Sequence, residues 1–494
     1  MAKMDTEIQL NQNAHIHADN FRNGTYSPTE LLDKTLDYLE ELDTQLNAYI
    51  SVMHSEATLA AERASSTVDS GEATPLTGIP IAVKDLLNTK DWKTTAASKM
   101  LSTYVPVEDS TVVARLKAAG AVIVGKTNLD EFAMGSSNEF SAFGPVKNPW
   151  DINRVPGGSS GGSAVTVASR VVPLSIGTDT GGSIRQPAAF CGVLGLKPTY
   201  GRVSRFGVVA FASSLDQVGP FARDSYDLAN LLQVISGYDP KDSTSSQIPV
   251  PNFSSQLMHG LDGLTFGIPT GMLSSGIDPL VRSAFEESLK VLEANGARIN
   301  RDIRLPSIEA ALPVYYLIAP SEASANLARY DGVKYGHSAE LGESAEETMF
   351  NTRGEGFGPE VKRRILIGTY ALSAGYYDAF YLKAQKVRTV IRTEYEQALD
   401  KVDAILTPTT PTPAFELGAK LNDPLEMYLN DLYTLPANIA GLPGLSIPGG
   451  FVDGLPVGLQ IVGRPFSEPT LLRIANAYQT HTDWHNQAPD VSCN

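Results

Sequence analysis

The spacing of apolar residues predicts helices in the N-terminal part of the chain. Residues 27–30 read Ser-Pro-Thr-Glu, a capping box with proline at the first helical position. The apolar residues that follow are spaced as on one face of a helix: Leu31, Leu32, Leu36, Leu39 and Leu42. A second helix is predicted over residues 48–66. We therefore expect residues 1–70 to form a helical segment that packs on the rest of the protein.

From residue 78 onward, short apolar runs alternate with helical patterns. Residues 79–83 predict a buried strand that ends at Lys84, and residues 111–119 predict a helix followed by a strand over 121–124. Further candidate strands are residues 264–268, 297–299, 404–406, 445–447 and 457–462. Such alternation is typical of an α/β sheet covered by helices. Neither a long repeat nor a flexible linker interrupts it, so we expect a single domain over residues 1–494.

Composition and charge argue against several classes of protein. The 494 residues carry a net charge of −16 without a run of basic residues, so a nucleic-acid substrate would have to be held by another protein. Cys191 and Cys493 are too few for a disulfide framework or a four-ligand metal site. The polar N-terminus lacks the pattern of a signal peptide, and apolar runs of membrane-spanning length are absent from the sequence. We expect a cytoplasmic protein that does not contact a membrane.

Two loops rich in glycine and serine flank one apolar segment. Residues 156–163 read Pro-Gly-Gly-Ser-Ser-Gly-Gly-Ser, and residues 177–187 read Gly-Thr-Asp-Thr-Gly-Gly-Ser-Ile-Arg-Gln-Pro. One such loop alone fits a flexible turn, but a pair is more specific. Glycines let backbone N–H groups approach a ligand closely, as an oxyanion hole requires. We expect Thr180, Gly181 and Gly182 to form that hole beside Ser183.

A serine nucleophile needs a base to take its proton. Histidine is the usual base, but none of the seven histidines lies near either loop in the sequence. The segment around Ser183 also departs from the Gly-x-Ser-x-Gly elbow of α/β hydrolases, because Arg185 stands at the closing glycine. Lysine can serve as the base when burial lowers its pKa. Lys84 is the candidate, although taken alone it also fits a structural lysine at a strand end.

Together these residues resemble the amidase signature family. Both glycine loops and the 24-residue separation of Ser159 and Ser183 carry the resemblance, which extends from residues 78–85 to the C-terminal strand and helix. It implies a large mixed central β-sheet covered by helices on both faces. It also implies that Ser183 is the nucleophile, Ser159 a bridging serine in a cis peptide and Lys84 the general base, with no metal or cofactor in this chain. Asp179 and Arg185 are expected to pair structurally.

One further motif is set aside. Residues 120–127 read Gly-Ala-Val-Ile-Val-Gly-Lys-Thr, which matches the P-loop pattern. A working P-loop wraps a phosphate with the loop that follows a strand, whereas here the four middle residues are themselves the predicted strand. We therefore expect no phosphate site at this position. A nucleotide-binding module without enzymatic activity has no other support in the sequence.

Other segments narrow the substrate. Residues 321–336, 358–365 and 427–431 resemble the glutamine-hydrolysing components of tRNA-dependent amidotransferases, a branch of the amidase signature family. The resemblance implies that glutamine is hydrolysed and that its ammonia passes to a B subunit, which binds ATP, Mg²⁺ and most of the charged tRNA. There it would convert glutamyl-tRNA(Gln) to glutaminyl-tRNA(Gln), with amidation of aspartyl-tRNA(Asn) left open. A small C subunit would complete the heterotrimer.

Free glutamine is a zwitterion, so a selective pocket needs a guanidinium for its α-carboxylate and a carboxylate for its α-ammonium. The resemblance assigns these roles to Arg363 and Asp431, with Tyr315 or Tyr316 lining the pocket and Arg364 as the second choice. The two arginines also fit a solvated helix face. The alternative function is a free-standing amidase that acts on a small amide. Stimulation of glutamine hydrolysis by partner subunits together with charged tRNA would distinguish the first function from the second.

Overall fold

A computed structural model describes residues 8–273, 276–340 and 342–491. In these residues one sheet of eleven strands runs in the order β1-β3-β2-β4-β6-β5-β10-β11-β9-β7-β8. The strands are β1 (Tyr49–Val52), β2 (Pro80–Lys84), β3 (Val122–Thr127), β4 (Leu174–Asp179), β5 (Leu194–Lys197), β6 (Gln217–Ala222), β7 (Thr265–Gly267), β8 (Arg298–Asn300), β9 (Ala404–Pro408), β10 (Gly444–Val452) and β11 (Leu455–Val462). β2 runs parallel to β3 and β4, and β7 runs parallel to β8 and β9, whereas the other pairs are antiparallel. The predicted mixed sheet is confirmed.

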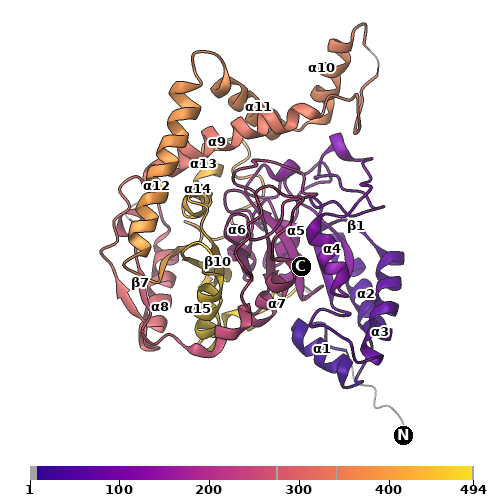
Figure 1. The fold of residues 1–494 in the computed structure, drawn as a ribbon, viewed down its shortest axis with the longest axis vertical. Coiled ribbons are helices and arrows are strands. Elements are labelled where there is room, and N and C mark those ends of the chain that lie inside the picture. Colours follow the sequence, from indigo (N-terminus) through magenta and orange to yellow (C-terminus); the bar gives the residue numbers. More distant parts are fainter. Residues whose placement is uncertain (1–7, 274–275, 341, 492–494) are drawn as a thin grey trace.

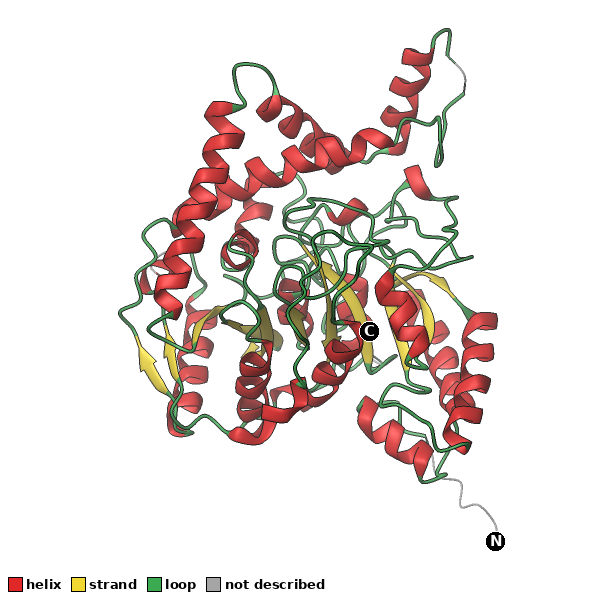
Figure 2. Cartoon of the chain, viewed as in Figure 1, coloured by secondary structure: helices red, strands yellow, loops and turns green. Residues whose placement is uncertain are grey.

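Helices surround the strands (Figure 2). They are α1 (Ala14–Arg22), α2 (Pro28–Leu46), α3 (His54–Asp69), α4 (Thr111–Ala118), α5 (Gly161–Ala168), α6 (Arg185–Cys191), α7 (Ser225–Ile235), α8 (Pro279–Ala294), α9 (Ala311–Asn326), α10 (Ala345–Gly356), α11 (Pro359–Leu372), α12 (Lys383–Leu399), α13 (Pro424–Tyr428), α14 (Leu435–Ile439) and α15 (Glu468–Thr480). Helices α9 to α12 form a layer at one end of the molecule, from which α10 projects (Figure 1). In the described part of the chain, every helix is too short or too polar to cross a membrane.

The N-terminal segment differs from the prediction in one element. Helix α2 begins with the predicted capping box: Ser27 Oγ accepts a hydrogen bond from Glu30 N, and the Glu30 carboxylate accepts one from Ser27 N. The prediction of one helix over residues 48–66 is wrong, because Tyr49–Val52 is a strand and α3 begins only at His54. The strand pairs antiparallel with β3 at the edge of the sheet. Aromatic and β-branched residues favour this pairing over a helix.

The parallel strands β2 and β4 bring two distant segments together. Val83 lies opposite Ile176 in their register, so both strands end at the same edge of the sheet. Lys84 is the last residue of β2, and the glycine loop that carries Ser183 follows β4 directly. Helix α5 begins at Gly161, within the other glycine-rich segment and directly after Ser159 and Ser160. The sheet therefore places the lysine between the two loops.

The P-loop match forms no loop. Val122–Thr127 is a fully buried strand of the central sheet. The Lys126 ammonium lies 3.0 Å from Asp85 Oδ1 and donates hydrogen bonds to Leu87 O and Thr94 Oγ1, both at 2.9 Å. Its donors are used within the core, so Lys126 is a structural residue.

Candidate active site

Lys84 contacts three hydroxyl groups in a buried site. Its Nζ lies 2.8 Å from Ser159 Oγ, 2.8 Å from Ser160 Oγ and 2.9 Å from Thr178 Oγ1. The side chain is fully buried, and burial lowers the pKa of Lys84 to about 7, against the opposing charges of Asp130 and Asp179. A lysine with this pKa is partly neutral at physiological pH, so it can take a proton from a serine.

The loop that carries Ser159 is held from several directions. The peptide bond between Gly158 and Ser159 is cis. Gly158 N donates to Gln186 Oε1 at 2.8 Å, and Ser159 O accepts from Asp130 N at 3.2 Å. A side chain at residue 158 would not fit, because a Cβ atom there would lie 2.1 Å from Asp130 Oδ2. The packing around this loop requires glycine and fixes the direction of the Ser159 hydroxyl.

Ser183 lies between β4 and α6 and is 7% exposed. Its carbonyl oxygen accepts a hydrogen bond from Ser160 N at 3.2 Å, which joins the two glycine loops. Among the described residues, the Ser183 hydroxyl has no hydrogen-bond partner, so it is available to a substrate. Lys84, Ser159 and Ser183, which the sequence predicts as one catalytic group, therefore come from three segments that meet at this edge of the sheet.

The loop before Ser183 has three uncommitted N–H groups. Within the part of the chain that the structure describes, Thr180 N, Gly181 N and Ser183 N have no acceptor. Gly182 N, by contrast, donates to Asp179 Oδ1 at 2.8 Å. The sequence predicts Gly182 as part of the oxyanion hole, but this contact takes its N–H away from a substrate. The arrangement favours Thr180, Gly181 and Ser183 as the donors.

Asp179 and Arg185, at the two ends of this loop, form an ion pair that holds it in place. Arg185 Nε lies 3.0 Å from Asp179 Oδ2, and both side chains are fully buried. Burial opposes the charged form of Asp179, but Arg185 outweighs it and holds the pKa of that carboxyl at about 2. Asp179 also accepts hydrogen bonds from Ile184 N and Asn438 Nδ2. The pair is structural, as predicted.

Asp431 and Tyr315 lie against the same loop. Thr434 Oγ1 lies 2.6 Å from Gly181 O, to which it donates, and 3.0 Å from Asp431 O. The Asp431 carboxylate accepts from Ser136 Oγ, and burial raises its pKa to about 7. Tyr315 packs on Gly181 so closely that a Cβ atom there would lie 2.7 Å from its ring. Both residues are therefore neighbours of Gly181, in the loop that carries the nucleophile.

The two arginines of α11 both pair with Glu360, but they differ in exposure and in their other neighbours. Arg363 is 39% exposed, pairs with Glu360 and lines a cavity of about 590 Å³ together with Glu131 and Lys362. Arg364 is 2% exposed, and its guanidinium carbon lies 5.4 Å from the ring centres of Tyr316 and Tyr428.

The charge of Arg364, like that of Asp431, acts on the pKa of the buried Tyr315 hydroxyl, which burial raises. Arg364 Nη2 is buried without a hydrogen-bond partner among the described residues. The burial of Arg364 and the action of its charge on the pKa of Asp431 thus favour Arg364, the second choice from the sequence, over Arg363.

Several residues of the site escape sequence reasoning. Ser160 and Thr178 accept hydrogen bonds from Lys84, as Ser159 does. Gln186 accepts one from Gly158 N in the loop that carries Ser159, and Ser136 donates one to the Asp431 carboxylate. Ser160 and Thr178 lie inside the two glycine loops, so their position is a usable signal. Ser136 belongs to a polar stretch after β3 that no motif distinguishes. Histidines make no hydrogen bond to Lys84, Ser159 or Ser183 in the described residues.

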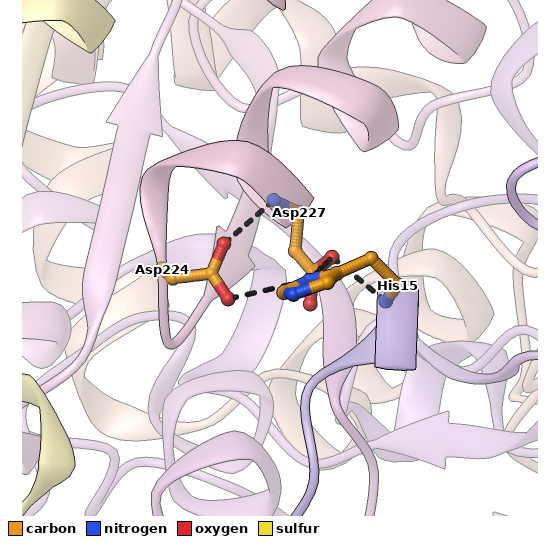
Figure 3. A group of neighbouring side chains, drawn as sticks. All are labelled: His15, Asp224 and Asp227. Atoms are coloured by element: carbon orange, nitrogen blue, oxygen red, sulfur yellow. Dashed lines mark hydrogen bonds and ion pairs between the residues drawn. The ribbon is translucent and has the colours of Figure 1, made fainter. Parts of the chain in front are cut away.

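A second group of titratable side chains lies at the start of α7 (Figure 3). His15 Nδ1 lies 2.9 Å from Asp227 Oδ1 and 3.7 Å from Asp224 Oδ2. The three residues each offer one atom that could bind a metal ion, and these atoms lie within 4.8 Å of one another. However, Asp227 also accepts from Ala14 N and His15 N, and Asp224 caps α7 by accepting from Asp227 N. The hydrogen bond to Asp227 raises the pKa of His15. These hydrogen bonds join the start of α1 to the start of α7, so the group is explained as a structural contact between the two helices.

Comparison with known proteins identifies the family of the chain. The sequence matches the Amidase family over residues 30–472. It is 56% identical to the A subunit of the glutamyl-tRNA(Gln) amidotransferase of Roseiflexus sp. (strain RS-1), over 95% of this chain and 96% of that protein. The corresponding protein of Sulfurihydrogenibium sp. (strain YO3AOP1) is 55% identical, over 94% and 96% of the two chains.

Solved structures give the same result. The crystal structure of the A subunit of the glutamyl-tRNA(Gln) amidotransferase from Thermotoga maritima matches with a TM-score of 0.81 at 42% identity, covering 98% of this chain and 99% of that one. A peptide amidase in complex with the inhibitor chymostatin matches with a TM-score of 0.83 at 31% identity, covering 97% and 99%. The chain thus belongs to the amidase family, and within it is similar over nearly its full length to the A subunits of glutamyl-tRNA(Gln) amidotransferases.

Proposed function

We propose that this chain is the glutaminase subunit of a glutamyl-tRNA(Gln) amidotransferase. It hydrolyses L-glutamine and supplies the ammonia with which a partner B subunit, binding ATP and Mg²⁺, converts glutamyl-tRNA(Gln) to glutaminyl-tRNA(Gln). The contact between Lys84 Nζ and Ser159 Oγ carries the proposal, because it joins a base of lowered pKa to the serine beside the free Ser183 hydroxyl. The similarity to glutamyl-tRNA(Gln) amidotransferases over 95% of the chain supports the choice of substrate.

In the proposed reaction, Ser183 Oγ attacks the side-chain amide carbon of glutamine. The proton of Ser183 passes through the Ser159 hydroxyl to neutral Lys84. The tetrahedral intermediate then collapses, its C–N bond breaks, and the leaving nitrogen takes the proton back as ammonia. Water attacks the resulting glutamyl ester by the same relay and releases glutamate. Each step uses Lys84 alternately as base and acid.

The negative charge of the intermediate needs donors that are fixed before the reaction. Thr180 N, Gly181 N and Ser183 N lack acceptors among the described residues and lie in the loop that carries the nucleophile. The Asp179–Arg185 pair and the hydrogen bond from Thr434 to Gly181 O hold this loop in place. These contacts support an oxyanion hole that needs no rearrangement when glutamine binds.

Recognition of the glutamine zwitterion is assigned to Arg364 and Asp431. The unpaired Nη2 of Arg364 would bind the α-carboxylate, and the Asp431 carboxylate would bind the α-ammonium. Tyr315 would line the pocket between Arg364 and Asp431. Amides without these charges gain nothing from such a pair, so the site favours glutamine over the simple amides of a free-standing amidase.

Helices α11 and α12 lie at one end of the molecule (Figure 1), and a partner protein is assigned to the surface on and between them. Its exposed apolar residues are Leu366, Tyr370, Tyr376, Tyr377, Leu382 and Val390, here called the hairpin surface. Lys383, Lys386 and Arg392 are exposed beside them, although the chain as a whole is acidic. Exposed aromatic clusters are typical of protein interfaces. We assign this surface to the B subunit, which would present an apolar face edged by carboxylates, and the small C subunit would complete the heterotrimer.

Co-purification of the chain with its B and C subunits, followed by glutamine-dependent amidation of misacylated tRNA, tests the proposal. Formation of glutaminyl-tRNA(Gln) with release of glutamate is the expected result. Turnover of simple amides without any response to the partners would instead support a free-standing amidase. Replacement of Tyr376 and Tyr377 by serine should reduce recovery of the B subunit, whereas Leu59→Ser, on exposed α3, should not.

A further inference from the structure

Glu360 lies in the first turn of α11 and contacts two arginines of the next turn. Arg363 and Arg364 follow it by three and four positions, so both lie on its side of the helix. Its Oε1 accepts hydrogen bonds from Arg364 Nε, at 2.8 Å, and from the Tyr428 hydroxyl, at 2.9 Å. Its Oε2 accepts one from Arg363 Nη1. The carboxylate is buried and gives each arginine its own oxygen.

These contacts fix the orientation of Arg364. Glu360 occupies the Nε edge of the guanidinium, and the rings of Phe211, Tyr316 and Tyr428 lie within 5.6 Å of its central carbon. A guanidinium held at one edge and on its faces can bind a ligand only through its remaining edge. That edge carries Nη1 and Nη2, and Nη2 is buried without a partner among the described residues.

The charges at this position also favour an anion. A lone carboxylate beside the α-carboxylate of a ligand would repel it, but three donors cover Glu360. Glu360 cancels one of the two arginine charges and leaves one positive charge at the pocket. Without Glu360, the Arg364 Nε group would lose its partner and the guanidinium could turn away from the ligand.

We propose that Glu360 is a positioning residue for substrate recognition, which aims the free edge of Arg364 at the α-carboxylate of the substrate. This inference rests on the proposed glutaminase function. Glu360 touches neither the substrate nor Ser183, so it acts on binding through Arg364. If Glu360 only held its two arginines within α11 and accepted the hydrogen bond from Tyr428 of α13, its loss would instead affect the fold without selecting between substrates.

The test compares two substrates in the assembled enzyme. Glutamine carries the α-carboxylate, and 4-aminobutyramide is the same molecule without it. Glu360→Gln should raise KM for glutamine about tenfold or more with little change in kcat, and should leave kcat/KM for 4-aminobutyramide unchanged. Glu360→Asp, which keeps the charge but shortens the side chain, should give an intermediate KM. Glu394→Gln removes another helical carboxylate, one that accepts hydrogen bonds from Ser307, and should leave kcat and KM unchanged for both substrates.

Labelling of Ser183 by a sulfonyl fluoride reports whether the catalytic serine is intact in each variant. An unchanged KM for glutamine in a labelled Glu360→Gln enzyme would overturn the positioning role and leave the proposed function standing. Equal losses of kcat/KM for both substrates in Glu360→Gln and Glu360→Asp would also overturn it, in favour of a structural role. A wild-type enzyme that is labelled but releases no ammonia from glutamine would overturn both inferences.

Discussion

Lys84 Nζ and Ser159 Oγ lie 2.8 Å apart, although 75 positions separate them in the chain. Lys84 ends β2 at the edge of the sheet where its parallel neighbour β4 also ends, and the loop before α5 brings Ser159 to the same edge. Burial removes water from the lysine and lowers its pKa to about 7.

Ser183→Ala should abolish glutamine hydrolysis and leave the fold intact, since the hydroxyl makes no hydrogen bond to the described residues that would support the structure. A loss of about 10³-fold or more in kcat is expected, as for other catalytic serines. Ammonia release and the thermal melting curve measure the two effects. Ser66→Ala, on the exposed side of α3, is the matched control and should retain full activity. Substantial ammonia release by a folded Ser183→Ala protein would rule out this nucleophile.

The pH dependence of kcat should report Lys84. Lysine accepts a proton only when neutral, so kcat at saturating glutamine should fall as pH drops below about 7 and level off above it. The pKa of Asp431 is also about 7, and its ionised form is the one that binds an ammonium. KM should therefore rise in acid as well, and Asp431→Asn should abolish this rise but keep the kcat profile. A kcat that does not change with pH would contradict a lysine base.

Replacement of the two arginines separately should distinguish their roles. Arg364→Ala should raise KM for glutamine by about 10- to 100-fold, the range expected for loss of a charged hydrogen bond. Arg363→Ala should change KM much less, since that side chain is half-exposed beside a different cavity. Steady-state kinetics of both variants decide between them. The reverse order of effects would return the role to Arg363.

Lys126→Met should destabilise the protein without affecting nucleotide binding. The change leaves Asp85 buried without its charged partner, at a cost of about 3–5 kcal/mol in the free energy of unfolding. Urea denaturation measures this loss, and Lys126→Met combined with Asp85→Asn should recover part of it. ATP should not shift the melting temperature of the wild-type chain. An ATP-dependent shift that Lys126→Met removes would mean that residues 120–127 bind phosphate after all.

Local sequence predicts those elements whose conformation depends on near neighbours. The capping box before α2 and the apolar runs of β2, β3, β9, β10 and β11 are examples. For residues 49–52 the local pattern predicts a helix instead, because the edge of β3 that they pair with lies more than 70 positions away. The aromatic and β-branched residues of this segment suit a strand, but only the pairing with β3 makes it one.

The choice between Arg363 and Arg364 shows the same limit. Consecutive helical residues point about 100° apart, so one of the two must face the interior, but the periodicity alone does not say which. The rings of Phe211, Tyr316 and Tyr428 decide it, and they come from segments far from α11. Likewise, the glycine loop predicts an oxyanion hole, but only the contact with Asp179 shows that Gly182 N is already used.

The sequence by itself indicated the candidate catalytic group, because the two glycine loops and the strand before Lys84 carry the resemblance to the amidase signature family. Tertiary structure alone decided that Lys84 contacts Ser159, Ser160 and Thr178 at once, which arginine faces Asp431, and which N–H groups remain free among the described residues. Each of these depends on distances between segments that only the folded sheet brings together. Burial in that fold also sets the pKa of Lys84, and a lysine at an exposed strand end would stay charged.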